Sequence, residues 1–204
     1  MLIVKSKYKI AKRLGAGVFE QTQTQKFALS EARSRDSKKG GRRGGSEFGR
    51  QLLEKQRVRF TYGLSERQLS NYVADATHAK DPSVALYKML EMRADTALYR
   101  AGFAPTRRAA RQAVSHGHMT INGRRITTPS HKVGVGDALG IREGARKSPL
   151  YAGLADKPSE ERRSVPNWLS ADLTLLVAKV EKEPVYVPSE SALDFRTVFE
   201  FYSR

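Results

Sequence analysis

Apolar side chains recur at helical spacing in the first half of the chain. A basic segment over residues 48–60 has Leu52, Leu53 and Val58 as its expected packing residues. The next segment carries apolar side chains at i, i+3, i+4 and i+7 from Leu69 onward, and it follows a Ser-Glu-Arg-Gln capping box. An Asp-Pro pair marks the start of a third helix. These apolar stripes predict a helical core.

Shorter elements are predicted in the middle of the chain. A first helix over residues 96–101 is expected to be capped by Asp95 and to end at Gly102. A second helix over residues 107–116 is expected to be capped by Thr106 and to bury its alanines and one valine on a single face. Strand signals follow directly after these two helices.

The strand signals centre on a hairpin. Asn122-Gly123 lies between two short runs, and this dipeptide suits a type I′ turn because both of its positions need positive φ. The turn would pair Thr120 with Arg125 and point Arg125 outward. A second alternation surrounds a Gly-Asp turn, at Val133, Val135, Leu139 and Ile141. Together these elements predict two short helices packed on a small antiparallel sheet.

The charge of the chain is large and unevenly placed. Its 37 Lys and Arg against 21 Asp and Glu give a net charge of +16. Residues 1–60 carry +11 and residues 91–150 carry +7, whereas residues 61–90 are neutral and residues 151–204 carry −2. Charge kept only for solubility would be spread along the chain. Two concentrated blocks predict separate surfaces for a polyanion.

Residue content disfavours several kinds of site. The chain has no cysteine, which excludes a disulfide framework, a thiolate metal site and a cysteine nucleophile. No stretch approaches the ~20 apolar residues of a transmembrane helix, and the first ten residues lack the apolar segment of a signal peptide. His116 and His118 form a His-x-His pair, but two ligands without a carboxylate or cysteine cluster are insufficient for a metal. We expect no metal, no cofactor and no membrane partner.

A glycine-rich basic tract covers residues 34–49. Its glycines alternate with Lys38, Lys39, Arg42 and Arg43, which can donate to phosphate while the glycines allow close backbone approach. We expect this tract to become ordered against nucleic acid. A flexible linker is the alternative interpretation.

The second short helix is the strongest candidate for an RNA-contacting element. Arg107, Arg108, Arg111 and Gln112 lie opposite its apolar face, and arginine can bind phosphate with two parallel hydrogen bonds. Further candidate RNA contacts are placed on the basic first helix, at the ends of the short helices and around the hairpin. They are Arg50, Lys55, Arg57, Arg59, Arg100, Thr106, His116, His118, Asn122, Arg124, Arg125 and Lys132.

Residues 93–139 resemble the alpha-L-type RNA-binding domain first described in the fourth protein of the small ribosomal subunit. They carry the Arg-x-Asp opening, the Tyr-Arg-x-Gly-Phe-Ala-x-Thr-Arg-x-x-Ala-Arg-Gln core, the Ser-His-Gly-His link, the Asn-Gly hairpin and the closing Gly-Asp. Residues 52–69, 165–169 and 199–204 also resemble the family of that ribosomal protein. The absence of cysteine points to the zinc-free branch of the family.

The resemblance implies a structural, non-enzymatic component of the small ribosomal subunit. It implies direct and early binding to 16S-type rRNA in the 5′ domain, nucleation of the subunit body and a contribution to translational accuracy. The implied partners are ribosomal protein S-five and, near the path by which mRNA enters, mRNA itself. A bacterial-type ribosome in the cytoplasm is the expected location, and an organellar ribosome is the less favoured one.

The fold class implied by the resemblance is α+β. A mostly helical domain formed by both termini carries an inserted small α/β RNA-binding module. The expected divisions are a basic arm over 1–46, a helical domain over 47–92 completed by about 188–204, the module over 93–155, and a C-terminal tail over 156–204 that packs on both. Trp168 is expected to be a packing anchor between module and tail, with base stacking as its alternative role.

Two other functions are also compatible with parts of the sequence. An RNA-modifying enzyme or synthetase fragment could borrow the module, because Arg93-x-Asp95-Thr96 faintly resembles a pseudouridine synthase motif. The 54 residues after position 150 are too few for the catalytic domain of such an enzyme. A regulator could instead use the two short helices as a DNA-reading helix-turn-helix, which would prefer duplex DNA.

Overall fold

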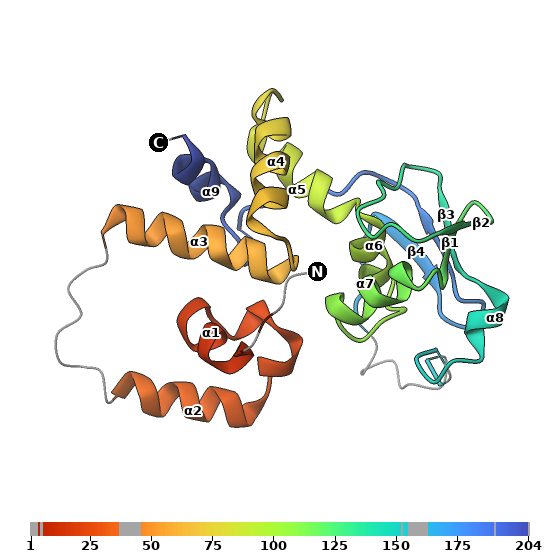
Figure 1. Cartoon of the computed structure of the whole chain (residues 1–204), viewed down its shortest axis with the longest axis horizontal. Coiled ribbons are helices and arrows are strands. Elements are labelled where there is room, and N and C mark those ends of the chain that lie inside the picture. The colour runs from red at the N-terminus through yellow and green to blue at the C-terminus, as the bar shows by residue number, and fades with distance from the viewer. Residues whose placement is uncertain are drawn as a thin grey trace. The chain divides into compact units, whose positions relative to one another are not determined.

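The structure is a computed structural model in which residues 4, 6–36, 46–151, 153–154, 163–189 and 191–203 are described. The chain forms two compact units. Unit 1 comprises residues 1–86 and 186–204, and unit 2 comprises residues 87–185. The fold is α+β, as expected: unit 1 is helical over its described residues, and unit 2 combines helices with an antiparallel sheet (Figure 1).

Unit 1 is built from helices contributed by both ends of the chain. They are α1 (Lys7–Leu14), the 3-10 turns η1 (Ala16–Val18) and η2 (Glu20–Thr22), α2 (Gln25–Asp36), α3 (Glu47–Thr61), α4 (Glu66–Thr77), the start of α5 (Pro82–Glu91) and α9 (Phe195–Tyr202). Helix α3 packs against α9 and α1, and α4 also contacts α9. The C-terminal helix therefore completes a core begun by the N-terminal half of the chain.

Local signals place the starts of two helices correctly. The Ser65 side chain accepts a hydrogen bond from the Gln68 backbone at 3.2 Å, and the Gln68 side chain accepts from the Ser65 backbone at 3.1 Å. This confirms the predicted capping box. At the start of α5, the Asp81 carboxylate accepts from the backbone N–H groups of Ser83 and Val84. The predicted apolar stripe of α4 is buried at Leu69, Val73 and Ala76.

Helix α3 differs from its prediction in the residues that it buries. Leu52 and Leu53 are only half-buried, whereas Gln51, Lys55 and Val58 are buried. Lys55 forms an ion pair with Glu66 at 2.6 Å, and the Gln51 Nε2 donates to Glu47 and Glu200. The apolar pattern alone therefore misplaced the packed face of this helix.

Residues 7–36 contain more regular structure than the expected arm over 1–46. Helix α1 buries Ala11 and Leu14, and the Val18 side chain is also buried. Phe27 of α2 is 4% exposed and forms a ring contact with Tyr8. Residues 7–27 therefore contribute buried side chains to unit 1, whereas the predicted low-complexity tract begins at residue 34.

Unit 2 contains a five-stranded antiparallel sheet in the order β2-β1-β3-β5-β4. The strands are β1 (Met119–Ile121), β2 (Arg124–Ile126), β3 (Ala138–Ile141), β4 (Leu169–Asp172) and β5 (Val177–Val180). The predicted hairpin is confirmed in register, with Thr120 opposite Arg125. Asn122 and Gly123 have φ values of 50° and 78°, as the type I′ turn requires.

The sheet extends beyond the expected end of the module at residue 155. Strand β5 pairs with β3, and β4 pairs with β5, although both belong to the stretch expected as a tail. Trp168, 3% exposed, belongs to the core of this unit, so its packing role is confirmed. The region around residues 165–180 is thus an integral layer of unit 2.

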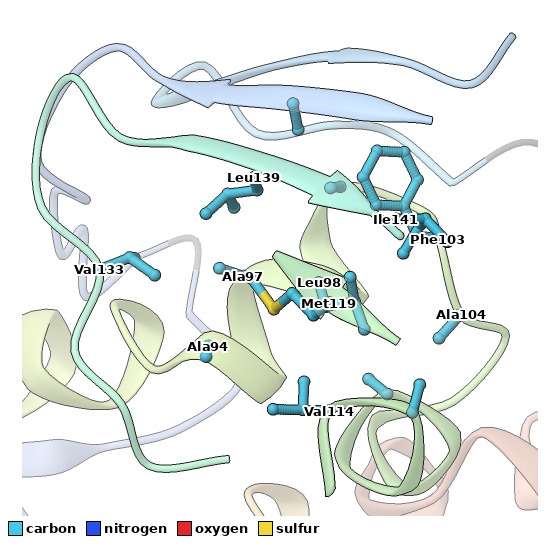
Figure 2. Close-up of a cluster of buried hydrophobic side chains, with 14 of the residues drawn as sticks. Ala94, Ala97, Leu98, Phe103, Ala104, Val114, Met119, Val133, Leu139 and Ile141 are labelled. Carbon is cyan, nitrogen blue, oxygen red and sulfur yellow. The ribbon is translucent and has the colours of Figure 1, made fainter. Parts of the chain in front are cut away.

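Helices α6 (Ala94–Arg100) and α7 (Arg107–Ser115) pack on this sheet, and a short α8 (Glu143–Arg146) follows β3. Figure 2 shows Ala97 and Leu98 of α6, Val114 of α7, Met119 of β1 and Leu139 of β3 gathered in one buried cluster. The small alanines let the helices approach the strands closely. The predicted arrangement of two short helices on an antiparallel sheet is confirmed.

Two predictions in this unit are wrong in detail. Asp95 does not cap α6, because Arg93 is the N-cap residue and the N–H groups of Ala94 and Asp95 donate to the carbonyl groups of His131 and Pro129. Val135 does not extend the buried alternation, since it is 53% exposed next to a turn. Residues 129–133, which precede β3, therefore bind the start of α6 through backbone hydrogen bonds and do not form a strand of the sheet.

Candidate nucleic-acid interface

The two ends of helix α7 fix the direction in which its arginines point. The Thr106 hydroxyl accepts a hydrogen bond from the Ala109 N–H at 3.0 Å, as predicted, and Gly117 ends the helix at φ 70°. Ala110, Ala113 and Val114 are buried against the core. The three arginines of α7 consequently lie on the side opposite this buried face.

The three arginines of α7 have different surroundings. Arg108 is exposed. The Arg107 side chain is 15% exposed, donates to Glu91 at 3.4 Å, and lies 4.6 Å from the Tyr99 ring centre. Arg111 is 14% exposed and donates from Nε to Asp95 at 2.7 Å. Arg108 therefore differs from its two neighbours, which are held against buried carboxylates.

Two further arginines bind the same carboxylates. Arg100 donates to both oxygens of Glu91 at 2.6 and 2.9 Å, and Arg93 donates to both oxygens of Asp95 at 2.9 Å. Glu91 is 0% exposed and Asp95 is 3% exposed. Ionised carboxylates can be buried this deeply because each has two guanidinium partners.

The hairpin lies against the end of α7. The Arg125 Nη2 donates to the carbonyl of His116 at 3.2 Å, so its side chain passes directly over Gly117. A Cβ atom at Gly117 would lie 2.1 Å from the Arg125 Nε. Arg124 is exposed on the neighbouring position of β2. This contact places the Arg125 guanidinium at the C-terminal end of α7.

A group of aromatic and cationic side chains surrounds His118. Its ring lies 5.9 Å from the rings of both His116 and Tyr151, and its Nδ1 is 3.3 Å from the Tyr151 hydroxyl. Burial lowers the pKa of the His118 imidazole, and the positive charges of His116, Arg142 and Arg125 lower it further. The two arginines among these neighbours would also attract a phosphate group.

Residues 129–133 dock on the junction of α5 and α6 and carry Lys132 at the surface. Besides the bonds to Ala94 and Asp95, the Val133 N–H donates to the Met92 carbonyl at 2.9 Å. Lys132 is exposed, and so is Gln112 on α7. The Asn122 side chain instead serves the turn, because it donates to Asp137 at 2.8 Å and accepts from the Ala138 N–H at 2.9 Å.

The candidate RNA-binding residues on α3 belong to unit 1, and most of them bind other residues of this unit. Lys55 is paired with Glu66 and lies 4.4 Å from the Phe201 ring centre. Arg57 donates to the Leu14 carbonyl at 2.6 Å and pairs with Glu54. Arg59 donates to Gln56 at 3.0 Å. Arg50 is exposed.

Four predicted contacts lie outside the described residues, namely Lys38, Lys39, Arg42 and Arg43. The structure also reveals cations that the sequence pattern did not single out. Lys9, Lys12 and Arg13 are exposed on α1, and Arg142, Arg146 and Lys147 are exposed around α8. The run KYKIAKR, which holds four cations and no acid, was the available signal for the first group.

Arg163 is another residue that the sequence pattern missed. Its guanidinium lies 3.7 Å from the Tyr99 ring centre and donates to the carbonyls of Tyr99, Ala104 and Pro105. Arg163 thereby ties the chain before β4 to the connection between α6 and α7. No local sequence signal identifies this contact, because its partners lie about sixty positions earlier.

Two kinds of site are absent from the described part of the chain. No group of three or more His, Asp or Glu side chains there is arranged to hold a metal ion. None of the helices in the described ranges has the length and apolar character needed to span a membrane.

Two family models match the chain in adjacent ranges. The S4 domain matches residues 92–139, which contain α6, α7, β1, β2 and the first two residues of β3. The Ribosomal protein S4/S9 N-terminal domain matches residues 4–92. Strands β4 and β5 fall outside both ranges.

Curated relatives match over nearly the whole chain. The chain is 36% identical over 197 residues to the small ribosomal subunit protein uS4 of Roseiflexus sp. (strain RS-1), covering 96% of both chains. It is 34% identical over 201 residues to the protein of the same name from Borrelia turicatae, covering 98% of this chain and 96% of the relative. The corresponding protein of Herpetosiphon aurantiacus is 40% identical over 160 residues, which is 78% of this chain and 76% of the relative.

Proposed function

The chain belongs to the small ribosomal subunit protein uS4 family, and from this premise we propose that it binds small-subunit rRNA of the 16S type. Membership of this family makes it a structural protein and not an enzyme. Its proposed role is that of a constituent of the small ribosomal subunit.

The observation that carries the proposal is the cationic surface of unit 2. Arg108, Arg124, Arg125 and Lys132 are exposed within or beside α7 and the hairpin, inside the range matched by the S4 domain. Cations on one compact scaffold suit the shape and phosphate contacts by which folded RNA is recognised. This surface supports RNA over a small-molecule ligand.

The finer parts of the proposal rest on the family resemblance. They are binding to the 5′ domain of the rRNA, nucleation of the subunit body, a contribution to translational accuracy, and residence in a bacterial-type ribosome in the cytoplasm. Ribosomal protein S-five is the proposed protein partner, and mRNA is a further one. The net charge of −2 over residues 151–204 supports protein contacts for that stretch, because it would not attract phosphate.

A filter-binding assay tests the RNA proposal. The full chain is titrated against a transcript of the small-subunit rRNA 5′ domain, with duplex DNA as competitor, over a series of salt concentrations. We expect tight RNA binding that survives the competitor and falls steeply with salt. Equal affinity for both nucleic acids would contradict the proposal, and preference for duplex DNA would favour the helix-turn-helix alternative.

A further inference from the structure

Six side chains of unit 2 form two ion clusters, which we call the ion network. In one, Glu91 binds Arg100 and Arg107, and in the other, Asp95 binds Arg93 and Arg111. The two carboxylates are buried, whereas Arg100, Arg107 and Arg111 are partly exposed above them. Four guanidinium groups and two carboxylates give the network a net charge of +2. The two carboxylates therefore lie in the interior of unit 2, and guanidinium groups are the part of the network that contacts solvent.

The network joins the helices that carry the candidate interface. Glu91 ends α5 and binds arginines at the end of α6 and at the start of α7. Asp95 lies in the first turn of α6 and binds Arg111 in the middle of α7. Each acid thus connects its own helix to arginine side chains of other helices.

Fold stability alone does not explain such an arrangement. Buried ion networks contribute little net stability compared with apolar residues of similar size, because removing charged groups from water is unfavourable. What a network does supply is geometry, since a carboxylate bound to Nε holds the plane of the guanidinium. An arginine ordered before binding loses less side-chain freedom when it meets its ligand.

We propose that Glu91 and Asp95 are positioning residues, which hold Arg100, Arg107 and Arg111 in the orientation that binds RNA phosphates. This inference rests on the proposed RNA-binding function and assigns a role to two acidic residues within a cationic surface. Neither acid contacts the RNA itself. Each acts through the arginines that it orders.

The proposal makes a prediction opposite in sign to simple electrostatics. Replacing Glu91 by Gln or Asp95 by Asn raises the net charge of the interface by one, and added positive charge alone would strengthen binding to a polyanion. Loss of arginine positioning would weaken binding instead. The direction of the change therefore separates the two explanations.

The experiment measures binding of the full chain to the 5′-domain transcript for Glu91→Gln, Asp95→Asn and a control, Glu143→Gln. Glu143 is an exposed acid of α8 in the same unit, so its replacement reports the effect of charge alone. We expect the first two variants to bind about tenfold more weakly, and the control to bind equally or up to about twofold more tightly. Unchanged or tighter binding by Glu91→Gln and Asp95→Asn would overturn the proposal.

A double-mutant cycle tests whether Glu91 acts through its arginines. In a chain that carries Arg100→Ala and Arg107→Ala, the added Glu91→Gln change should have little further effect on RNA affinity. An unchanged tenfold effect in that background would overturn the positioning role. Titration at high RNA concentration gives the fraction of active protein, which a purely structural defect lowers and a positioning defect leaves intact.

Thermal unfolding without RNA identifies any variant that does not fold. In that case Arg100→Lys replaces Glu91→Gln, or Arg111→Lys replaces Asp95→Asn, because lysine keeps the charge beside the carboxylate but lacks the planar fork. We expect about tenfold weaker RNA binding with the active fraction retained, and wild-type affinity would overturn the proposal. Failure of the wild-type chain to bind the transcript would instead refute the proposed function.

Discussion

At the residue scale, the cations of the candidate interface are of two kinds: some are exposed to solvent, and others are bound to buried carboxylates. Arg108 and Arg124 are exposed, whereas Arg107 and Arg111 lie against buried acids. Helical spacing in the sequence predicts that Arg107, Arg108 and Arg111 share one side of α7. It cannot predict their acidic partners, because Glu91 and Asp95 are each sixteen positions earlier than the arginine they bind on α7.

Replacing Arg108 by Ala should weaken RNA binding without loss of stability. We expect the slope of log affinity against log salt to fall by about one, because one phosphate contact is removed. The melting temperature should stay unchanged, since no buried group loses a partner. Lys182→Ala, at an exposed position of the same unit outside the candidate interface, is the matched control.

Arg107→Ala and Arg111→Ala should flatten the salt slope similarly but also lower the free energy of unfolding. Each change removes one of the two guanidinium partners of a buried carboxylate, which we expect to cost about 1–3 kcal/mol. Urea unfolding measures the stability, and the salt series measures the slope. An unchanged slope in all three arginine variants would place α7 outside the interface.

RNA affinity should depend on pH through His118. The folded state lowers the pKa of His118, so the folded chain favours the neutral imidazole. The stability that this contributes is present above the ordinary histidine pKa of about 6.5 and is lost as the pH falls below it. A bound phosphate raises the pKa, so RNA affinity should increase as the pH falls from about 8 to about 6.

Binding titrations across that pH range on His118→Gln check this dependence. The variant should lose most of the increase in affinity at low pH. His78→Gln, which alters an exposed histidine of unit 1, should keep it. An equal pH profile for His118→Gln and the wild-type chain would refute the assignment.

At the element scale, local signals predicted most of what the chain forms. The capping box of α4, the Thr106 cap of α7 and the register of the hairpin were predictable because each depends on residues within a few positions. The start of α6 was not predictable from local sequence, because the carbonyl groups of residues 129 and 131 accept hydrogen bonds from its first N–H groups. Asp95 therefore does not cap the helix, and its side chain pairs with arginines instead. The strands β4 and β5 were missed for the same reason, since pairing between β3 and β5 is not encoded locally.

Gly117→Ala should disturb both α7 and the hairpin. The position has φ 70°, and an added Cβ would clash with the Arg125 side chain. We expect a loss of about 1–2 kcal/mol in the free energy of unfolding, together with weaker RNA binding as Arg125 is displaced. Chemical denaturation measures the first effect.

Gly144→Ala is the control for this change. Gly144 lies in α8 without positive φ, and its nearest contacts to an added Cβ are at 3.8 Å or more. Its replacement should be neutral or slightly stabilising. Equal stability of the two alanine variants would contradict the clash at Gly117.

At the scale of the whole molecule, both units are cationic. Unit 1 carries 20 basic and 11 acidic residues, and unit 2 carries 17 and 10, so their net charges are +9 and +7. The two basic blocks of the sequence, residues 1–60 and 91–150, therefore belong to different units of the structure.

Both units should consequently contribute to the salt dependence of RNA binding. A variant with Lys9→Ala, Lys12→Ala and Arg13→Ala removes exposed cations of α1 while leaving its buried Ala11 and Leu14 in place. We expect the salt slope of the full chain to fall by about one to three, with the melting temperature retained. A slope equal to that of the wild-type chain would leave α1 outside the interface.

The place of β5 between β3 and β4 also has a consequence for biosynthesis. The last residue of β3 and the first residue of β5 are Ile141 and Val177, which lie 36 positions apart (177 minus 141). At a synthesis rate of about 5–20 residues per second, the ribosome needs roughly 2 to 7 seconds to add the intervening chain. During that interval the nascent protein exposes an unpaired edge on β3, which is open to mispairing with other chains. The sheet can therefore close only after residues 177–180 of β5 have been synthesised.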